Sequence, residues 1–215
     1  MSDTKFWNSH YQRFEVFEPS AFAKFCVDQW ITENDTVIEI GCGNGRDGMF
    51  LAKNCREYFA VDASAGAIDQ FSKRLEAHDA RTRIHLHCGD VADFDFKQCT
   101  PQDGRRIVLY SRFSLHSMDE ATELLVLNQF LQLGSKNLFA IEARTIFDPL
   151  YGVGNEVGRN AYVTDHYRRF IDPRDLLNFA MTNTELLYFN LSNGFAVTAN
   201  EDPIVLRAVL QSQNK

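Results

Sequence analysis

A run of apolar residues that leads directly into a glycine-rich bend is the feature that most limits how this chain can fold. The run covers residues 37–40, and the bend contains Gly41, Gly43, Gly45 and Gly48. Glycine permits positive φ angles and, without a Cβ, lets a ligand approach the main chain. The helix that we expect over residues 49–53 would offer its first N–H groups to a polar or anionic ligand group. This segment therefore predicts a strand, a ligand-binding turn and a helix.

Apolar runs alternate with amphipathic segments along the following sequence, as in the βαβ units of a parallel sheet. The runs predict five strands, at residues 36–40, 58–61, 83–87, 107–111 and 138–143. Helices are expected over residues 65–78 and 118–133, the second ending at Gly134, and an earlier helix over residues 19–30, capped by Ser20 or started by Pro19. The pattern predicts a three-layer α/β fold with a doubly wound, mostly parallel sheet.

Residues 145–169 break this alternation and predict a long loop. Loops of this length in a compact domain usually act as lids or binding loops. A helix over residues 172–181 is expected next, followed by apolar runs at 185–191 and 204–210 that predict an antiparallel pair at the sheet edge. We therefore expect a single domain over residues 1–215, with a lid over residues 145–171.

The composition limits which binding partners and which cellular compartment we expect for this protein. The 215 residues carry a net charge of -7, which argues against a nucleic-acid backbone as the partner. The 5 cysteines include no CxxC pair and predict reduced thiols rather than disulfides or a zinc site. The sequence contains no cationic leader and no apolar run long enough to span a membrane, so a cytoplasmic protein is expected.

Glu39 stands inside the otherwise apolar strand that precedes Gly41. A buried carboxylate disfavours folding unless something compensates its charge. A cationic ligand group would do so, and so would a side chain such as Arg46. S-adenosylmethionine (SAM) carries an ammonium and a sulfonium, whereas NAD presents a pyrophosphate that a carboxylate repels. The GxGxxG spacing of Gly43, Gly45 and Gly48 also starts later than it does in dinucleotide folds.

Two more acidic residues follow predicted strands. Asp62 ends the second strand, where a carboxylate can accept two ribose hydroxyls of either SAM or NAD. Asp90 follows the third strand and would accept from the adenine amino group, with Val91 packed on the ring. The alternative for Asp90 is a plain turn or cap residue.

These segments resemble three motifs of the class I SAM-dependent methyltransferases. Residues 39–45 are similar to the first motif of that family, residues 61–64 to the second and residues 89–91 to the third. The resemblance implies the strand order 3-2-1-4-5-7-6 with the last strand antiparallel, SAM as the cofactor and S-adenosylhomocysteine (SAH) as its product. The cofactor-binding residues that we expect are Tyr11, Glu39, Gly41, Cys42, Gly43, Asn44, Arg46, Asp47, Asp62, Ala63, Ser64, Gly89, Asp90, Val91 and Ser111.

A second set of candidates follows the fourth and fifth strands and lies in the predicted lid. Methyl transfer is an in-line displacement that depends mainly on orientation, and a hydroxyl acceptor benefits from a base such as histidine. His116 is the first candidate base, unless it only packs or caps a helix. The catalytic candidates are His116, Arg112 and His166, and the expected substrate-binding residues are Arg144, Tyr167, Arg168 and Arg169.

Arginines in this set suit an anionic acceptor, because guanidinium groups bind phosphate and carboxylate bidentately. In the alternative, they pair with Asp165, Asp172 or Asp175. No Asp/Asn-Pro-Pro-aromatic motif follows the fourth strand, which disfavours methylation of nucleic-acid bases. No metal is predicted, because His85 and His87 lack further ligands.

The aromatic residues of the segment 6–14 are too many for a disordered tail. The segment resembles the N-terminal flap of thiopurine- and tellurite-resistance-type methyltransferases, which implies a flap over residues 1–20 and a hydrogen bond from Tyr11 to the SAM carboxylate. Residues 110–116 and 165–170 resemble bacterial methyltransferases that modify capsule or surface-glycan precursors, including the phosphoramidate-modifying kind.

The expected function is methyl transfer from SAM to a hydroxyl or phosphate-type oxygen of a small, anionic metabolite, such as a nucleotide-activated or surface-glycan precursor. A monomer or homodimer without nucleic-acid or membrane partners is expected. Two alternatives remain. A NAD-dependent oxidoreductase would use the same glycines and Asp62, and a non-catalytic SAM-binding partner subunit would have the cofactor site without a working acceptor pocket.

Overall fold

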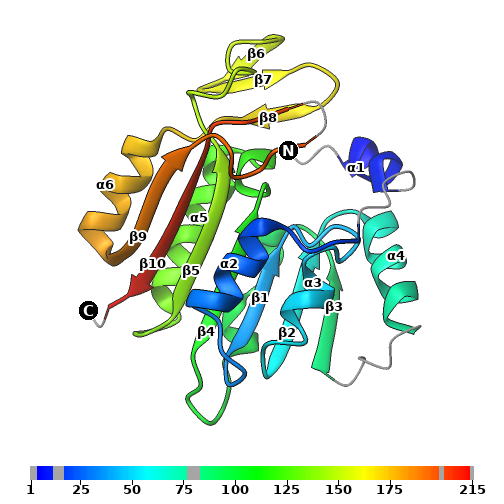
Figure 1. The fold of residues 1–215 in the computed structure, drawn as a ribbon, viewed down its shortest axis with the longest axis vertical. Coiled ribbons are helices and arrows are strands. Elements are labelled where there is room, and N and C mark those ends of the chain that lie inside the picture. Colours follow the sequence, from blue (N-terminus) through cyan, green and yellow to red (C-terminus); the bar gives the residue numbers. More distant parts are fainter. Residues whose placement is uncertain (1–3, 12–16, 77–82, 199–200, 214–215) are drawn as a thin grey trace. The chain divides into compact units, whose positions relative to one another are not determined.

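The computed structural model describes residues 4–11, 17–76, 83–198 and 201–213 (Figure 1). A seven-stranded sheet has the order β3-β2-β1-β4-β5-β10-β9, and a second sheet has the order β6-β7-β8. This confirms the predicted α/β fold and its strand order. The chain divides into two compact units, residues 4–110 and residues 111–215. None of the described helices is long and apolar enough to cross a membrane.

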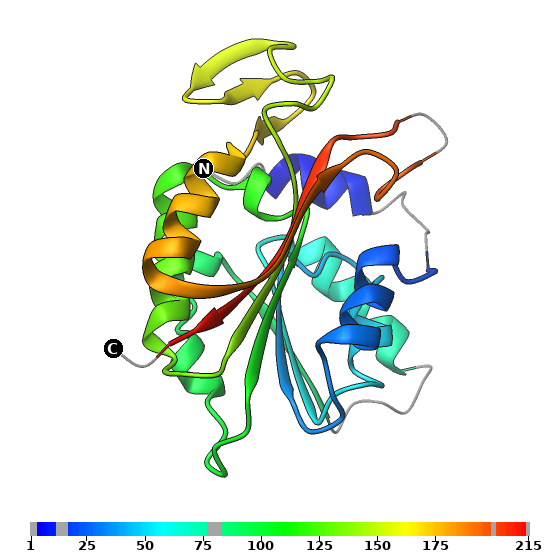
Figure 2. The ribbon, with the colours of Figure 1, turned by 60° about the vertical axis from the view of Figure 1, so that its left-hand side comes forward.

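The first unit contains three parallel strands, β1 (Thr36–Ile40), β2 (Glu57–Asp62) and β3 (Ile84–Cys88). All five residues of β1 are buried, as expected for a central strand of a parallel sheet. Three helices, α2 (Ala21–Gln29), α3 (Gly48–Leu51) and α4 (Ala65–Glu76), lie on one face of these strands (Figure 2). Short 3-10 helices cover Val91–Asp93 and Phe96–Cys99.

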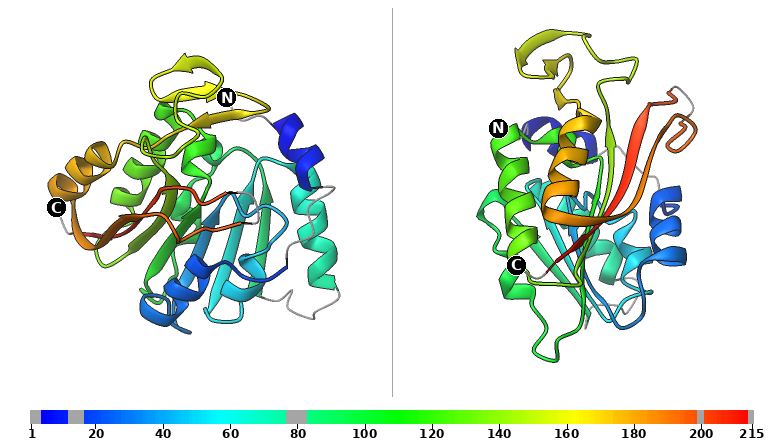
Figure 3. Two further views of the ribbon diagram at one scale, coloured as in Figure 1. Left: turned by 45° about the horizontal axis from the view of Figure 1, so that its top comes forward. Right: turned by 90° about the vertical axis from the view of Figure 1, so that its left-hand side faces the viewer.

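Helix α1 (Thr4–Tyr11) lies beside the N-terminal end of α4 (Figure 3). It belongs to the predicted flap over residues 1–20, of which residues 1–3 and 12–16 lie outside the described residues. The end of the helix predicted at residues 65–78 also lies outside them. Ser20 caps α2 as predicted, since its Oγ accepts a hydrogen bond from the N–H of Ala23 at 3.0 Å.

The boundary between the units falls within β4 (Ile107–Arg112). The second unit contains the strands β5 (Leu138–Arg144), β9 (Thr184–Ser192) and β10 (Val205–Ser212). Strand β10 pairs antiparallel with both β5 and β9, which confirms the predicted antiparallel pair. Helices α5 (Glu120–Gln132) and α6 (Pro173–Asn183) cover one face of these three strands (Figure 2). Gly134, just after α5, has a φ of 88°, as predicted for a helix end.

The segment predicted as a long loop contains three short antiparallel strands, β6 (Asn155–Gly158), β7 (Ala161–Val163) and β8 (Tyr167–Arg169). The turn between β6 and β7 includes Asn160 at a φ of 56°, a conformation that asparagine tolerates well. The prediction of a long loop missed these strands, because strands of three or four residues are too short to show a hydrophobic period.

Candidate active site

The glycine-rich bend has the backbone conformation that its sequence predicts. Gly41, Gly43 and Gly45 have φ angles of 70°, 55° and 76°. The N–H groups of Gly41 and Cys42 donate to the carbonyl of Val61 at 2.8 and 3.3 Å, so the chain is still tied to β2 where it leaves β1. Residues with a Cβ rarely adopt these angles, so the bend requires its glycines.

Aromatic side chains of the protein fill the space beside three of these glycines. A Cβ on Gly43 would lie 2.5 Å from the hydroxyl of Tyr11, and one on Gly45 would overlap the ring of Phe71. A Cβ on Gly48 would overlap the hydroxyl of Tyr58. The close approach that we expected of a ligand is therefore made here by protein rings. Helix α3, expected over residues 49–53, is a single turn, Gly48–Leu51.

Glu39 is 4% exposed and accepts a hydrogen bond from the hydroxyl of Tyr58. Burial, reinforced by the charge of Glu39, raises the pKa of Tyr58 well above its ordinary value, so this hydroxyl keeps its proton. A protein side chain thus compensates for one carboxylate oxygen, as the alternative reading allowed. That side chain is Tyr58, while Nε of Arg46 donates to the carbonyl of Glu18 at 2.8 Å.

Asp62 holds the two turns that follow β1 and β2. Its Oδ2 accepts from the N–H of Gly43 and its Oδ1 from the N–H of Ser64, both at 2.8 Å. Burial raises the pKa of Asp62, while the two N–H groups lower it. Each carboxylate oxygen has two lone pairs, so an oxygen that accepts one N–H group can also accept a ribose hydroxyl. The residue therefore fits the nucleoside of SAM.

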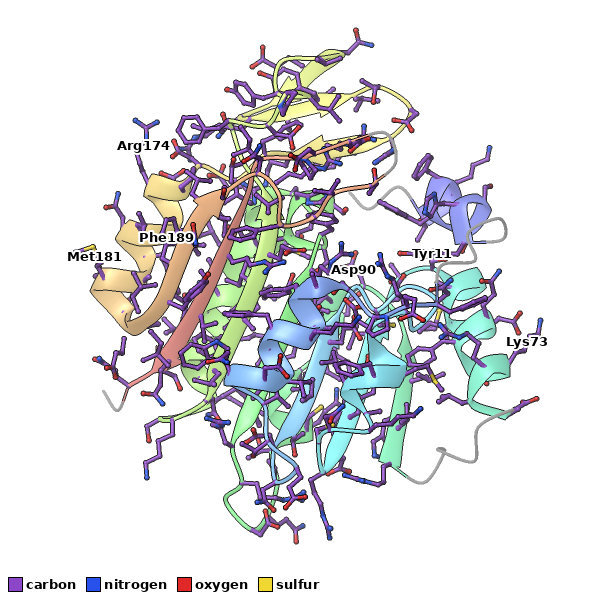
Figure 4. All side chains as sticks on the ribbon, in the orientation of Figure 1. Tyr11, Lys73, Asp90, Arg174, Met181 and Phe189 are labelled. Carbon is purple, nitrogen blue, oxygen red and sulfur yellow. The ribbon has the colours of Figure 1, made fainter. Side chains whose placement is uncertain are left out.

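The turn after β3 holds the predicted adenine residues. Asp90 caps the 3-10 helix that follows, because its Oδ1 accepts from the N–H of Ala92 at 3.0 Å, and Val91 is buried. Gly89 makes room for the imidazole of His87, since a Cβ there would lie 2.7 Å from Nε2 of that ring. Asp90 and Tyr11 lie at the same end of the first unit (Figure 4). The cap role of Asp90 is thus present, and its contact with adenine stays a prediction.

Asp47 fastens the start of α2 to the bend. Its Oδ1 accepts from the N–H of Ser20 at 2.7 Å, and its Oδ2 accepts from the hydroxyls of Ser20 and Tyr110 at 2.7 and 2.8 Å. These contacts give Asp47 a structural role beside the predicted cofactor role. The carbonyl of Asn44 accepts from Nη1 of Arg74 at 2.8 Å, which ties the bend to α4.

Sequence reasoning missed Asn8, whose Oδ1 accepts from Oγ of Ser64 at 2.7 Å and from the N–H of Gly66 at 3.1 Å. No local pattern marks Asn8, because its partners lie far away in the sequence. In the second unit, the buried predicted residue Ser111 has its Oγ 2.6 Å from that of Ser114.

His116, also in the second unit, is 5% exposed, and its Nδ1 has no hydrogen-bond partner among the described residues. Burial lowers its pKa well below the ordinary value, and four cationic groups lower it further. These groups belong to Arg144, Arg168, His166 and Arg112. The imidazole is therefore neutral at neutral pH, the state that a general base requires.

The arginines predicted to bind the acceptor have acidic partners in the structure. Arg168 Nη1 lies 3.1 Å from Asp165 Oδ1, and Arg144 Nη1 lies 3.1 Å from Asp148 Oδ2. The buried guanidinium of Arg169 pairs with Glu123. Further pairs join Arg112 to Glu142, Arg174 to Asp172 and Arg159 to Asp175. The alternative of arginine–acid pairing is therefore what the structure shows, since a buried cation needs a partner.

The remaining candidates of the acceptor side, His166 and Tyr167, and the neighbouring ring of Phe113 also lie in the second unit. Nδ1 of His166 lies 3.1 Å from Oδ1 of Asp165. The ring of Phe113 has its centroid 4.5 Å from the guanidinium carbon of Arg112 and 5.3 Å from the ring centroid of His116. Phe113 has a φ of 57°, a rare conformation for an aromatic residue. Tyr167 is half-buried. Across the part of the chain that the structure describes, no three His, Cys, Asp or Glu side chains group as metal ligands do.

Comparisons with known proteins find methyltransferases among the similar sequences and structures. Residues 37–132 match a family described as "Methyltransferase domain". Over 63 residues the chain is 32% identical to a probable cobalt-precorrin-6B C(15)-methyltransferase (decarboxylating) from Methanococcus vannielii, which corresponds to 29% of this chain and 34% of that protein. The chain thus matches only about a third of the length of this curated relative.

Solved structures extend the likeness to the whole sheet. A SAM-dependent methyltransferase from Methanosarcina mazei superposes with a TM-score of 0.71 at 13% identity, covering 88% of this chain and 97% of the other. One from Clostridium acetobutylicum has a TM-score of 0.66 at 12% identity and covers 99% and 93%. At these identities the likeness concerns the fold. Together with the match of residues 37–132 to a methyltransferase domain family, it makes this chain similar in sequence and in fold to the SAM-dependent methyltransferases.

Proposed function

We propose that this chain transfers a methyl group from SAM to a hydroxyl or phosphate-type oxygen of a small, anionic metabolite, such as a nucleotide-activated or surface-glycan precursor. The observation that carries this proposal is the buried, neutral imidazole of His116 among cationic groups. The residues proposed for the cofactor precede β4 apart from Ser111, and those proposed for the acceptor follow it apart from Arg112, the last residue of β4.

Three carboxylates are proposed to bind the cofactor. Glu39 would receive the ammonium of the methionine moiety, Asp62 the ribose hydroxyls and Asp90 the adenine amino group. The remaining bend residues, with Ala63, Ser64 and Tyr11, would contact the rest of the molecule. When bound, SAM supplies a methyl group on a sulfonium, which is a good leaving group.

His116 is proposed to accept the proton of a hydroxyl acceptor at Nδ1. This atom is buried, and no described residue donates to it or accepts from it. The guanidinium groups of Arg144, Arg168 and Arg112 lower the pKa of His116, although each of these arginines has an acidic partner. Guanidinium groups in this position would favour an anionic group on the acceptor. An acceptor oxygen that is already ionised would need these guanidinium groups but not the base.

Calorimetry with SAM, SAH and NAD tests the cofactor. We expect heat with SAM and SAH, and Asp62→Ala should weaken binding roughly 5- to 100-fold, as for the loss of hydrogen bonds to a charged group. Binding of NAD in place of SAM would establish the oxidoreductase, and heat with none of the three would remove the cofactor assignment.

Release of SAH from matched pairs of acceptors, with and without a phosphate or carboxylate, tests the acceptor. We expect turnover only with the anionic member of a pair, and a large loss of kcat in His116→Gln with hydroxyl acceptors. His85→Gln, which changes an exposed histidine of β3, is the control. Unchanged turnover in His116→Gln, Arg112→Ala and Arg168→Ala would refute the acceptor site. SAM binding without turnover on any acceptor class would favour the non-catalytic partner subunit.

A further inference from the structure

Helix α1 contacts two turns of the first unit, and both turns are bound to the same carboxylate. The two turns follow β1 and β2, and the carboxylate is that of Asp62. Asn8 forms one contact and Tyr11, one helical turn later, forms the other. Because residues i and i+3 lie on the same side of a helix, one face of α1 reaches both turns.

The contact through Asn8 fixes α1 to the start of α4. Its Oδ1 accepts from Oγ of Ser64 at 2.7 Å and from the N–H of Gly66 at 3.1 Å. The same Ser64 hydroxyl caps α4 by accepting from the N–H of Ala67 at 3.1 Å. The N–H of Ser64 donates to Oδ1 of Asp62 at 2.8 Å. A chain of hydrogen bonds therefore joins α1 to this carboxylate.

The contact through Tyr11 lies at the glycine-rich bend. The Tyr11 hydroxyl occupies the space beside Gly43 that a Cβ would fill. The N–H of Gly43 donates to the other oxygen of Asp62, at 2.8 Å. Each oxygen of Asp62 thus holds the main chain at one of the two points that α1 touches.

We infer that Asn8 is a positioning residue that couples the docking of α1 to ligand binding at Asp62. The ligand in this inference is the nucleoside of SAM or SAH, so that part rests on the proposed function. A ligand whose hydroxyls bind Asp62 fixes the carboxylate and, through the N–H groups of Gly43 and Ser64, the two turns on which α1 docks. By thermodynamic linkage, docking of α1 and ligand binding favour each other by the same factor, so a change that weakens docking also weakens ligand binding.

Amide hydrogen exchange of residues 4–11 in the full-length protein, without ligand, tests the contact itself. Asn8→Ala should speed exchange of α1. Ser9→Ala is the matched control, because the Ser9 hydroxyl is exposed and donates to the carbonyl of Lys5 within the same helix. Asn8→Asp retains an acceptor oxygen at the start of α4, where a negative charge is favourable, and should keep α1 protected. Equal exchange in Asn8→Ala and Ser9→Ala would overturn the inference, as would an Asn8→Asp variant as unprotected as Asn8→Ala.

SAH calorimetry on the same variants tests the coupling. Asn8→Ala should weaken SAH binding roughly three- to tenfold, the effect of losing one or two hydrogen bonds, while Ser9→Ala leaves it unchanged. SAH should also slow exchange of α1 in the wild type. Faster exchange in Asn8→Ala with an unchanged SAH affinity would overturn the coupling. Failure of the wild type to bind SAH would refute the proposed function, whereas the ligand-free exchange would still decide whether Asn8 holds α1.

Discussion

Glu142 lies opposite Arg207 in the ladder between β5 and β10, and its Oε2 accepts a hydrogen bond from Nε of that arginine at 2.7 Å. Its Oε1 accepts from Nε of Arg112 on β4 at 2.9 Å. The side chain of Glu142 is 1% exposed, so one buried carboxylate serves two guanidinium groups. Arg112, a catalytic candidate, therefore also has a structural role, because it shares the buried carboxylate of Glu142 with Arg207.

Removal of this carboxylate charge should destabilise the fold. Glu142→Gln would take the counter-charge of Glu142 away from two largely buried arginines, and we expect a loss of about 3–5 kcal/mol in the free energy of unfolding. Urea denaturation followed by circular dichroism measures it. Glu120→Gln removes a carboxylate from an exposed pair with Arg159 and should change little. Near-equal stability of the two variants would contradict the assigned role.

Gly45 should tolerate alanine less well than Gly104 does, although the two have similar φ angles of 76° and 71°. A Cβ on Gly45 would overlap the ring of Phe71, whereas no described atom lies within 4 Å of a Cβ on Gly104. Gly104→Ala should cost roughly 1–2 kcal/mol from backbone strain, and Gly45→Ala roughly 1–3 kcal/mol more from overpacking. Thermal denaturation gives the difference, and Phe71→Leu should recover part of it. Equal losses of stability in Gly45→Ala and Gly104→Ala would show that the ring of Phe71 can move aside at no energetic cost.

The free energy of unfolding should decrease as the pH is lowered, because His116 is buried in its neutral form. Its pKa in the folded protein lies well below its ordinary value of about 6.5, so the unfolded chain binds a proton first as the pH falls. The stability that the neutral imidazole allows is present above about pH 6.5 and is lost as the pH falls toward the folded pKa. Unfolding free energies at about pH 7.5 and 5.5 should therefore differ more in the wild type than in His116→Gln. His87→Gln, at an exposed position, controls for the loss of any histidine. Identical pH dependence in the wild type and His116→Gln would disprove the burial of a neutral ring.

Thiol labelling should be confined to one position. All five cysteines lie in the described residues, and Cys88 is exposed while Cys26, Cys42, Cys55 and Cys99 are buried. Burial raises the pKa of Cys55 and of Cys99 to about 12, which suppresses their thiolates. Iodoacetamide at neutral pH should modify the native protein once, and Cys88→Ser should abolish the reaction. Mass spectrometry measures the labelling. Rapid labelling of Cys88→Ser would show that the buried cysteines are accessible, which would contradict this prediction.

The main strands could be predicted because each combines a buried apolar run with a turn signal nearby. β1 has the predicted bounds, and Ser20 caps α2 as expected. The three strands of the second sheet were missed because they are too short to show a period. Among the site residues, Asp62 was found from its place at the end of β2. Asn8 and Glu142 were not, because their partners lie far away in the sequence and only the fold brings them together.

The position of β10 between β5 and β9 determines the order in which these strands can pair while the chain is synthesised on the ribosome. During synthesis, β9 emerges before β10, the strand that separates it from β5, so β9 cannot join the sheet until β10 is available. Until residues 205–212 have left the exit tunnel, the inner edge of β5 and all of β9 present unpaired main-chain groups, which other nascent chains or chaperones can bind.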